Sequence, residues 1–337
     1  MASSVSNPAK LPFPIDCAPI DGAPIDAAPP VESLPPFVAT SLLDGAIEGL
    51  TFLERSLLFA ELSRLSYFSR AEAGLVANAI GFPEIRFYDR DGAQAYIFSN
   101  DTDTVVTCRG TEPNEWNDVR ADLDAAWDAG ETVGRVHRGF KREVDDLWPR
   151  LEEALRSNDQ TLWFAGHSLG GAMAAICGGR CKLSAIDSNP RAIYTYGSPR
   201  VGNKRYINHV KLEYYRWVNN NDIVPRVPPA WLGYAHGGRE IYLNRKGQIS
   251  DVEGVWKMRD RFWGFWRSLR RGRVDHFSDH LMTEYIGALQ VLVDKESRGS
   301  RPRGLERFET TQPSPPSQFQ VTLADEPAKK PASASAV

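Results

Sequence analysis

The stretch LWFAGHSLGGAMAAI, residues 162–176, decides the fold of this chain. An apolar run leads into Ser168, and glycines stand two residues before and two residues after that serine, at Gly166 and Gly170. A serine hydroxyl is a weak nucleophile unless a base takes its proton, and a tight turn between a strand and a helix is one way to expose it. That turn crowds the backbone, which requires small residues at these two positions and produces the pattern G-x-S-x-G. We therefore predict a strand, then a nucleophilic serine at the turn, then a helix.

The residues on both sides of the turn support this interpretation. The run TLWFA before it suits a buried strand, and the run GAMAAICGG after it contains small residues that allow a helix to pack closely on a sheet. The alternative is a chance G-x-S-x-G in a chain that has 27 glycines. The strand-like run before the serine and the helix-like run after it favour the functional interpretation.

Strand-like and helix-like segments alternate along the middle of the chain. Strand-like runs include IRFYD, QAYIFSN, DTVVTCRG, RAIYTYGSP and EYYRWVNN, and helical runs such as RGFKREVDDLWPRLEEALRS separate several of them. Upstream, apolar residues in TSLLDGAIEGLTFLERSLLFAELSRLSYFS recur at three- and four-residue spacing, which indicates helices. Alternation of strands with helices predicts the α/β class, with much of the sheet parallel.

Both ends of the chain differ in composition from this middle part. Residues 1–36 are rich in Pro, Ala and Ser and include the repeat in PIDCAPIDGAPIDAAP, and residues 296–337 have the same character. Prolines in such runs prevent regular structure. We therefore expect two disordered extensions around one folded domain over residues 37–295.

The composition of the whole chain argues against several classes of protein. The 337 residues are 42% hydrophobic and carry a net charge of −3, which offers no global attraction for nucleic acid. No run approaches the ~18 apolar residues of a membrane span. The first residues lack a basic stretch followed by a long apolar run, so we expect a cytoplasmic protein and leave signal-independent export open.

Two of the four cysteines have a spacing that deserves a test for metal binding. Cys177 and Cys181 stand four residues apart in the expected helix, which would place both on one face. No histidine or further cysteine lies near them in the sequence, so we interpret them as buried or free thiols and predict no metal site.

A proton relay for Ser168 needs an acid and then a histidine later in the chain. The histidines that follow at a distance are His209, His236, His276 and His280. His280, in DHFSDHLMTEYI, opens an expected helix and is our choice as general base, with His276 as the second candidate.

Asp222, in YYRWVNNNDIVPRVPP, is the candidate for the acid. It stands where a strand is expected to end, ahead of a loop broken by prolines. A carboxylate at such a place can orient an imidazole and stabilise its cation. The alternative is an ordinary turn residue ahead of Pro225.

The negative charge that develops on an ester carbonyl during attack needs preorganised hydrogen-bond donors. One candidate is the backbone N–H of Leu169, the residue after the serine. The other is Thr111 in TVVTCRGTEPNEW, through its N–H and its hydroxyl, although an ordinary polar turn would show the same sequence.

Together these segments resemble the fungal-type, or class 3, lipases of the α/β-hydrolase superfamily. The resemblance spans roughly residues 50–292 and rests on six blocks in order: CRGT at 108–111, VHRGF at 136–140, GHSLGGA at 166–172, YGSPRVGN at 196–203, VNNNDIVPRVPP at 218–229 and DHLMTEYI at 279–286. It implies an α/β-hydrolase fold, with a mostly parallel central sheet flanked by helices. It also implies that Ser168 is the nucleophile, Asp222 the acid, His280 the base and Thr111 an oxyanion-hole residue.

The resemblance also implies a lid over the substrate, and the equivalent segment here is 112–130. Within it Trp116, Val119, Leu123 and Trp127 fall at helical spacing, with acidic residues on the rest of the surface. An amphipathic lid would hide this stripe when closed and meet lipid when open. A helix packed permanently on the core fits the same pattern.

Residues 255–274 depart from the family pattern. This segment carries an apolar stripe of aromatic residues, leucine and methionine, surrounded by lysine and arginine. Such a helix can lie on an anionic membrane surface, which would make it a peripheral contact with a lipid interface. It can equally bury its aromatic rings beside an acyl pocket and keep the arginines in water.

Three functional hypotheses follow. The first is a serine carboxylester hydrolase, above all a triacylglycerol lipase, that forms an acyl-enzyme and uses no metal or organic cofactor. The second is an esterase or phospholipase for short-chain, aryl or phospholipid esters. The third is an inactive lipid-binding protein with the same fold, and the joint presence of Ser168, Asp222, His280 and Thr111 argues against it. None of the three involves nucleic acid.

Overall fold

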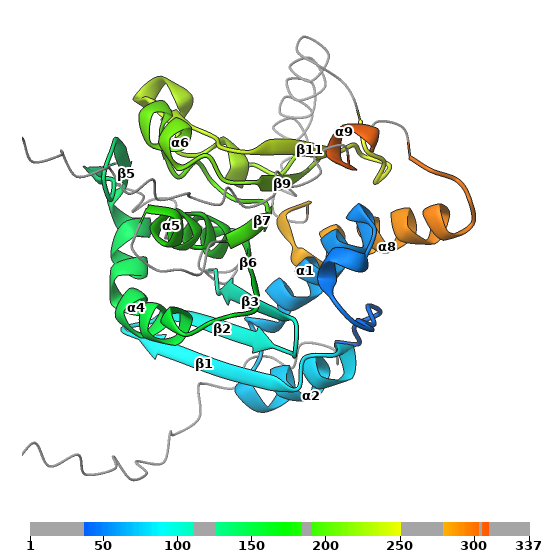
Figure 1. The fold of residues 1–337 in the computed structure, drawn as a ribbon. Helices are drawn as coiled ribbons and strands as arrows, with labels where there is room; N and C mark the ends of the chain where they lie inside the picture. Colours follow the sequence, from blue (N-terminus) through cyan, green and yellow to red (C-terminus); the bar gives the residue numbers. More distant parts are fainter. Residues whose placement is uncertain (1–36, 111–125, 184–189, 251–278, 303–304, 310–337) are drawn as a thin grey trace, which may run out of the picture. The chain divides into compact units, whose positions relative to one another are not determined.

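A sheet of seven strands is the central element of the computed structural model, which describes residues 37–110, 126–183, 190–250, 279–302 and 305–309 (Figure 1). The strands lie in the order β1-β2-β3-β6-β7-β9-β11. Their bounds are β1 Glu84–Arg90, β2 Ala93–Ser99, β3 Asp103–Cys108, β6 Thr161–His167, β7 Pro190–Tyr196, β9 Tyr214–Asn219 and β11 Arg239–Leu243.

Most neighbouring strands in this sheet are parallel. β1, β2 and β3 form an antiparallel meander, and the pairs β3–β6, β6–β7, β7–β9 and β9–β11 are all parallel. Parallel neighbours need long crossover connections, and helices between the strands provide them. The α/β class and the mostly parallel sheet predicted from the sequence are confirmed.

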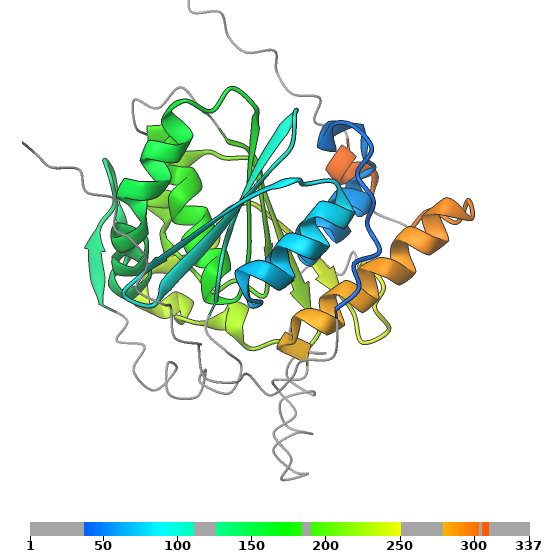
Figure 2. The ribbon, with the colours of Figure 1, turned by 90° about the horizontal axis from the view of Figure 1, so that it is seen from below.

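Helices cover both faces of the sheet. Their bounds are η1 Ile47–Gly49, α1 Phe52–Leu65, α2 Arg70–Ile80, α4 Arg138–Arg156, α5 Leu169–Leu183, α6 Lys204–Val210, η2 Val224–Arg226, η3 Ala230–Leu232, α8 Met282–Ser297 and α9 Glu306–Glu309. Helices α1 and α8 contact each other on one face, and α4 and α5 contact each other on the opposite face (Figures 1 and 2). Within the described ranges, no helix is both long enough and apolar enough to cross a membrane.

The two long helices that precede the first strand begin at strong local signals. The Thr51 hydroxyl accepts a hydrogen bond from the Glu54 N–H, and the Glu54 carboxylate accepts one from the Thr51 N–H. Ser69 and Glu72 form the same reciprocal pair at the start of α2. Each pair provides acceptors for two backbone N–H groups that would otherwise lack partners at the start of a helix.

The two faces of the sheet have different cores. On the α1 face aromatic rings pack together: ring centroids lie 4.6 Å apart for Phe59 and Tyr194, 5.4 Å for Phe59 and Trp163, and 4.9 Å for Phe52 and Tyr215. On the other face α5 is buried along nearly its whole length, because alanines and glycines let it approach the strands closely.

A second sheet of four strands is a feature that the sequence did not predict. Its order is β10-β8-β5-β4, with β4 Trp127–Ala129, β5 Arg135–His137, β8 Gly202–Asn203 and β10 Tyr234–Ala235. The helical spacing predicts that Trp127 lies in the candidate lid helix, and this prediction is wrong. It lies in strand β4 and stacks on Tyr234 with 3.8 Å between ring centroids, so pairing across the small sheet outweighs the helical pattern. The other lid residues, Trp116, Val119 and Leu123, lie outside the described residues, as do residues 255–274.

The folded part continues beyond the expected boundary at residue 295. Helix α8 ends at Ser297, and the short helix α9 follows after residues that include the buried Leu305. Phe308 in α9 stacks on Phe52 with 5.3 Å between ring centroids. Two apolar side chains therefore hold a segment against the core that composition alone assigned to the C-terminal extension.

Asp103 is a buried carboxylate that joins three parts of the structure at the start of β3. It is 1% exposed. It accepts hydrogen bonds from the indole Nε1 of Trp163 at 2.7 Å, the backbone N–H of Ile47 at 3.0 Å and the hydroxyl of Thr102 at 2.7 Å. Asp103 thereby links strand β3 to strand β6 and to the segment before α1.

We expect the substitution Asp103→Ala to lower the free energy of unfolding by about 2–4 kcal/mol, because it leaves a buried indole N–H and a backbone N–H without an acceptor. Urea denaturation followed by circular dichroism measures this change. Asp101, two residues away, is exposed, so Asp101→Ala serves as the control and should change the free energy of unfolding by less than about 0.5 kcal/mol. Equal effects of the two substitutions would contradict the role given to Asp103.

Candidate active site

Ser168 occupies the sharp turn between strand β6 and helix α5. The strand ends at His167 and the helix begins at Leu169, as the sequence predicted. Ser168 has φ of 57°, in the left-handed region that residues with a side chain seldom adopt. Its N–H donates to the carbonyl oxygen of Tyr196 in β7 at 2.9 Å, which helps to hold the strained turn.

The glycines on either side of Ser168 are required by contacts between backbone segments. A Cβ atom on Gly166 would overlap the carbonyl oxygen of Gly170, and a Cβ on Gly170 would overlap the carbonyl oxygen of Cys108 at the end of β3. Both positions therefore exclude every residue with a side chain unless the backbone moves. The steric reason inferred from the pattern G-x-S-x-G applies in this structure.

The structure brings Ser168, His280 and Asp222 together in one chain of hydrogen bonds. His280 Nε2 lies 2.9 Å from Ser168 Oγ, and His280 Nδ1 lies 2.9 Å from Asp222 Oδ2. Because a carboxylate accepts, Nδ1–H donates to Asp222 and Nε2 presents its lone pair to the serine hydroxyl. All three side chains are at most 2% exposed, so water competes little for these contacts. Such an arrangement can take a proton from Ser168 and stabilise the imidazolium that results.

The described residues include two of the other three histidines that follow Ser168 at a distance, and neither contacts the serine. His209 is exposed on α6, and His236 Nε2 lies 2.6 Å from the carbonyl oxygen of Pro225. His276, the second candidate, lies outside the described residues, as does Thr111. Leu169 is the first residue of α5, so its N–H has no partner within the helix and is available to an oxyanion.

The carboxylate of Asp222 is held by two donors besides His280. The Val224 N–H donates to Oδ1 at 2.9 Å, and the Tyr285 hydroxyl in α8 donates to Oδ2 at 2.7 Å. Tyr285 in turn accepts a hydrogen bond from the N–H of Asn219 at 3.0 Å. Burial, together with the nearby Asp222, raises the pKa of Tyr285 well above its usual value, so the hydroxyl stays a donor at neutral pH.

Three consecutive asparagines at the end of β9, residues 219–221, anchor the loop that carries the histidine. The side-chain amide of Asn219 donates to the carbonyl oxygen of Asp279 at 3.0 Å. The side chain of Asn220 and the N–H of Asn221 donate to the Asp279 carboxylate at 3.1 and 3.2 Å. The residue before His280 is thereby tied to the segment that bears Asp222.

His167 supports the same loop from the opposite side. A backbone carbonyl only accepts, so the His167 Nε2–H donates to the His280 carbonyl oxygen at 2.7 Å, and Nδ1 accepts from the Tyr67 hydroxyl at 2.9 Å. Burial, and then the neighbouring His280, lower the pKa of His167 well below its usual value of 6.5. His167 therefore stays neutral at neutral pH and fixes the backbone at His280.

Gly197 makes room for the acid and the base to meet. It has φ of 61°, and a Cβ atom on it would lie 2.6 Å from Asp222 Oδ2 and 2.8 Å from His280 Nδ1. Sequence reasoning gave no role to Gly197, Tyr285 or His167. All three stand inside the quoted blocks that carry the family resemblance, which was the one signal that could have pointed to them.

Comparison with known proteins places this chain among relatives of the class 3 lipases. The family model described as Lipase (class 3) matches residues 105–231. Toxin TseL of Vibrio cholerae is 30% identical over 44% of this chain and 30% of its own length. Secreted mono- and diacylglycerol lipase 1 of Fusarium solani is 36% identical over 32% of this chain and 34% of its own length. The chain therefore spans about a third of the length of these two relatives, and the resemblance to class 3 lipases predicted from the sequence is confirmed.

Comparison with solved structures supports the fold. The triacylglyceride lipase of Rhizomucor miehei matches with a TM-score of 0.50 and 23% identity, over 61% of this chain and 88% of that chain. At this level of identity the likeness concerns the fold alone. The expected α/β-hydrolase architecture is confirmed.

We expect Tyr285→Phe to lower kcat/KM for an ester substrate roughly 10- to 100-fold, because it removes a hydrogen bond to the charged Asp222 and the acceptor of the Asn219 N–H. Hydrolysis of a p-nitrophenyl ester measures the change. Tyr88→Phe in β1, away from the triad, is the matched control and should keep the wild-type kcat/KM. Wild-type activity in Tyr285→Phe would contradict the role of this hydroxyl.

The lowered pKa of His167 predicts a pH dependence of stability. Below pH 6.5 the unfolded chain binds a proton at this histidine while the folded chain does not, so the unfolded state gains protons and stability falls as the pH falls. The contribution is complete above pH 6.5 and is lost down to the lowered pKa of the folded state, with a slope of at most ~1.4 kcal/mol per pH unit.

Urea denaturation between pH 7.5 and 5 tests this prediction. His167→Gln cannot titrate, so its free energy of unfolding should depend on pH less steeply than that of the wild type. His209→Gln removes an exposed histidine and should keep the wild-type slope. Parallel curves for wild type and His167→Gln would show that His167 does not contribute.

Proposed function

We propose that this chain, which has the fold of the class 3 lipases, is a carboxylic ester hydrolase, and that its substrates are acylglycerols. The observation that carries the proposal is the buried chain of hydrogen bonds from Asp222 through His280 to Ser168. A site that only bound lipid would have no need for a base directed at a serine hydroxyl on a strained turn.

The proposed reaction begins with attack of Ser168 Oγ on the ester carbonyl carbon. His280 Nε2 takes the hydroxyl proton as the new C–O bond forms, and Asp222 stabilises the imidazolium through Nδ1–H. The carbonyl oxygen becomes an oxyanion, and the N–H of Leu169 donates to it at the start of α5. Thr111 is the proposed second donor, on the strength of its place after Arg109 and Gly110 alone.

The tetrahedral intermediate then releases the alcohol. The bond between the carbonyl carbon and the alkoxy oxygen breaks, and His280 gives its proton to that oxygen, which leaves an ester on Ser168. Water attacks this acyl-enzyme, and His280 takes one proton from the water. The Ser168 oxygen leaves with that proton, and the products are a carboxylic acid and the free enzyme.

Acylglycerol substrates are proposed because of the proteins to which this chain is similar. The relative from Fusarium solani, 36% identical over the matched part, is described as a secreted mono- and diacylglycerol lipase. Residues 112–125 of the candidate lid at 112–130 lie outside the described residues, as does the basic aromatic segment at 255–274, so neither segment adds to this choice. An esterase or phospholipase would use the same Ser168, His280 and Asp222.

The test is hydrolysis of p-nitrophenyl esters with acyl chains of two to eighteen carbons, followed by emulsified triacylglycerol and phospholipid vesicles. We expect turnover of long-chain esters and of triacylglycerol, and a loss of about 10⁴-fold or more in Ser168→Ala. Activity confined to short chains would replace the lipase assignment with an esterase. Equal rates in wild type and Ser168→Ala would overturn the proposed nucleophile.

A serine-directed phosphonate separates an enzyme from an inactive binding protein. Covalent labelling of the wild type, with none in Ser168→Ala, is expected if His280 activates the hydroxyl. No labelling of folded wild-type protein would favour the lipid-binding alternative.

A further inference from the structure

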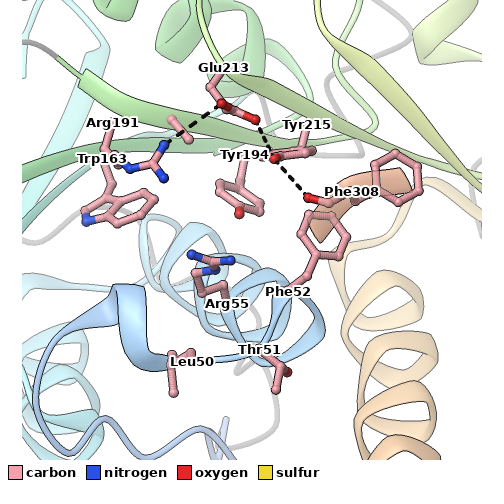
Figure 3. Close-up of a pocket in the computed structure, with 11 residues that line it drawn as sticks. Leu50, Thr51, Phe52, Arg55, Trp163, Arg191, Tyr194, Glu213, Tyr215 and Phe308 are labelled. Atoms are coloured by element: carbon pink, nitrogen blue, oxygen red, sulfur yellow. Dashed lines mark hydrogen bonds and ion pairs between the residues drawn. The ribbon is translucent and has the colours of Figure 1, made fainter. Parts of the chain in front are cut away.

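Figure 3 shows a cavity of about 230 Å³. It lies toward the end of the main sheet opposite Ser168. Its walls come from the start of α1, from the amino-terminal parts of β6, β7 and β9, and from α9. Trp163 in β6 lines it, whereas Ser168 follows the carboxyl end of the same strand. Five residues of extended chain separate the two, or about 16 Å, so the cavity is distinct from the candidate active site.

Five aromatic side chains form most of the apolar wall: Phe52, Trp163, Tyr194, Tyr215 and Phe308. Phe52 and Phe308 are stacked, with 12° between the ring planes, which places a flat apolar surface at one side of the cavity. Such a wall favours the apolar body of a small organic molecule over water.

Most of the charged and polar groups around the cavity already have partners. Arg191 donates to Glu48 at 2.6 Å and lies 3.9 Å from the carboxylate of Glu213. Glu213 also accepts the Tyr215 hydroxyl at 2.6 Å, and Tyr215 contacts the carbonyl oxygen of Phe308 (Figure 3). The Glu213 carboxylate is therefore engaged and does not present a free negative charge to a ligand.

Tyr194 and Arg55 are the exceptions. Tyr194 is only 1% exposed, yet its hydroxyl makes no hydrogen bond to any described residue and points into the cavity toward Arg55 (Figure 3). The guanidinium of Arg55 has no ion pair or hydrogen bond with the described part of the chain, and its Nε is shielded from solvent. Tyr194 is thus a buried polar group without a partner, which is costly, and Arg55 is a partly exposed cation whose charge no carboxylate among the described residues balances.

These two groups are both donors under ordinary conditions. Burial raises the pKa of Tyr194. The positive charge of Arg55 opposes this rise, because the guanidinium lies near the Tyr194 hydroxyl. The tyrosine therefore keeps its proton at neutral pH, and an arginine is always charged in proteins. Within the described residues, the cavity thus presents an O–H donor and a cationic fork, and neither has an acceptor as its partner.

We propose that this cavity binds a small monocarboxylate with an aromatic or short acyl body. The carboxylate accepts hydrogen bonds from the Arg55 guanidinium and from the Tyr194 hydroxyl, and the body lies against Phe52, Phe308 and Trp163. A carboxylate matches the planar fork of an arginine and supplies the negative charge that Arg55 lacks. A volume of about 230 Å³ is below the roughly 300–1,000 Å³ of pockets for drug-sized ligands, which favours a small ligand.

The test is isothermal titration calorimetry of the full chain with phenylacetate and with hexanoate, and with the neutral phenylacetamide as the isostere that removes the charge. We expect one saturable site for at least one carboxylate, and binding of phenylacetamide at least tenfold weaker than that of phenylacetate. Arg55→Met should weaken carboxylate binding at least tenfold, and Tyr194→Phe should weaken it to a smaller extent.

Arg150→Met is the matched control, because Arg150 is an exposed arginine on α4, which does not line the cavity, and it should bind like the wild type. Thermal unfolding of each variant shows that it is folded, and Tyr194→Phe carries the test alone if Arg55→Met does not fold. No saturable binding of either carboxylate to the wild type would overturn the proposal. Unchanged affinity in the cavity variants, equal binding of the amide, or tighter binding of inorganic phosphate would also overturn it.

Discussion

The left-handed backbone of Ser168 is the constraint on which the rest of the structure depends. A residue with a side chain is held at φ of 57° only if its surroundings leave no alternative, and here they come from three strands. β6 leads into the turn, β7 accepts the Ser168 N–H through Tyr196, and the end of β3 lies so close that Gly170 has no room for a side chain. The small residues of α5 follow from the same requirement, because the helix must leave the turn in contact with the sheet.

Buried polar contacts with residues outside the triad position the candidate catalytic groups, in addition to the contacts within the triad. Asp222 has donors at both carboxylate oxygens, and the loop of His280 is held by the asparagines at the end of β9 on one side and by His167 on the other. Each of these contacts satisfies a group that would be costly to bury alone. The network therefore allows one arrangement of the imidazole, with Nε2 directed at Ser168, and alternatives would leave several polar groups without partners.

The two ends of the parallel strands carry different chemistry. At the carboxyl ends, the turn after β6, the loop after β9 and the segment before α8 bring the nucleophile, acid and base together. At the amino ends, aromatic side chains from α1, β6, β7 and β9 surround the cavity that contains Arg55 and Tyr194. The same strands join both regions, and rings of the aromatic core on the α1 face form the wall of the cavity. A rigid sheet can thus separate two sites by the length of a strand.

The sequence by itself determined the features that depend on neighbouring residues. The turn at Ser168, the strand before it, the helix after it and the α/β alternation follow from local sterics and periodicity, and the family resemblance directed attention to Asp222 and His280. Tertiary structure decided the rest, because it depends on contacts between residues far apart in the chain. It selected His280 over His209 and His236, gave Tyr285 and Gly197 their places around Asp222, and put Trp127 in a strand against Tyr234. It also brought Phe308 onto Phe52, since an apolar side chain in a polar segment finds its partner only when the core has formed.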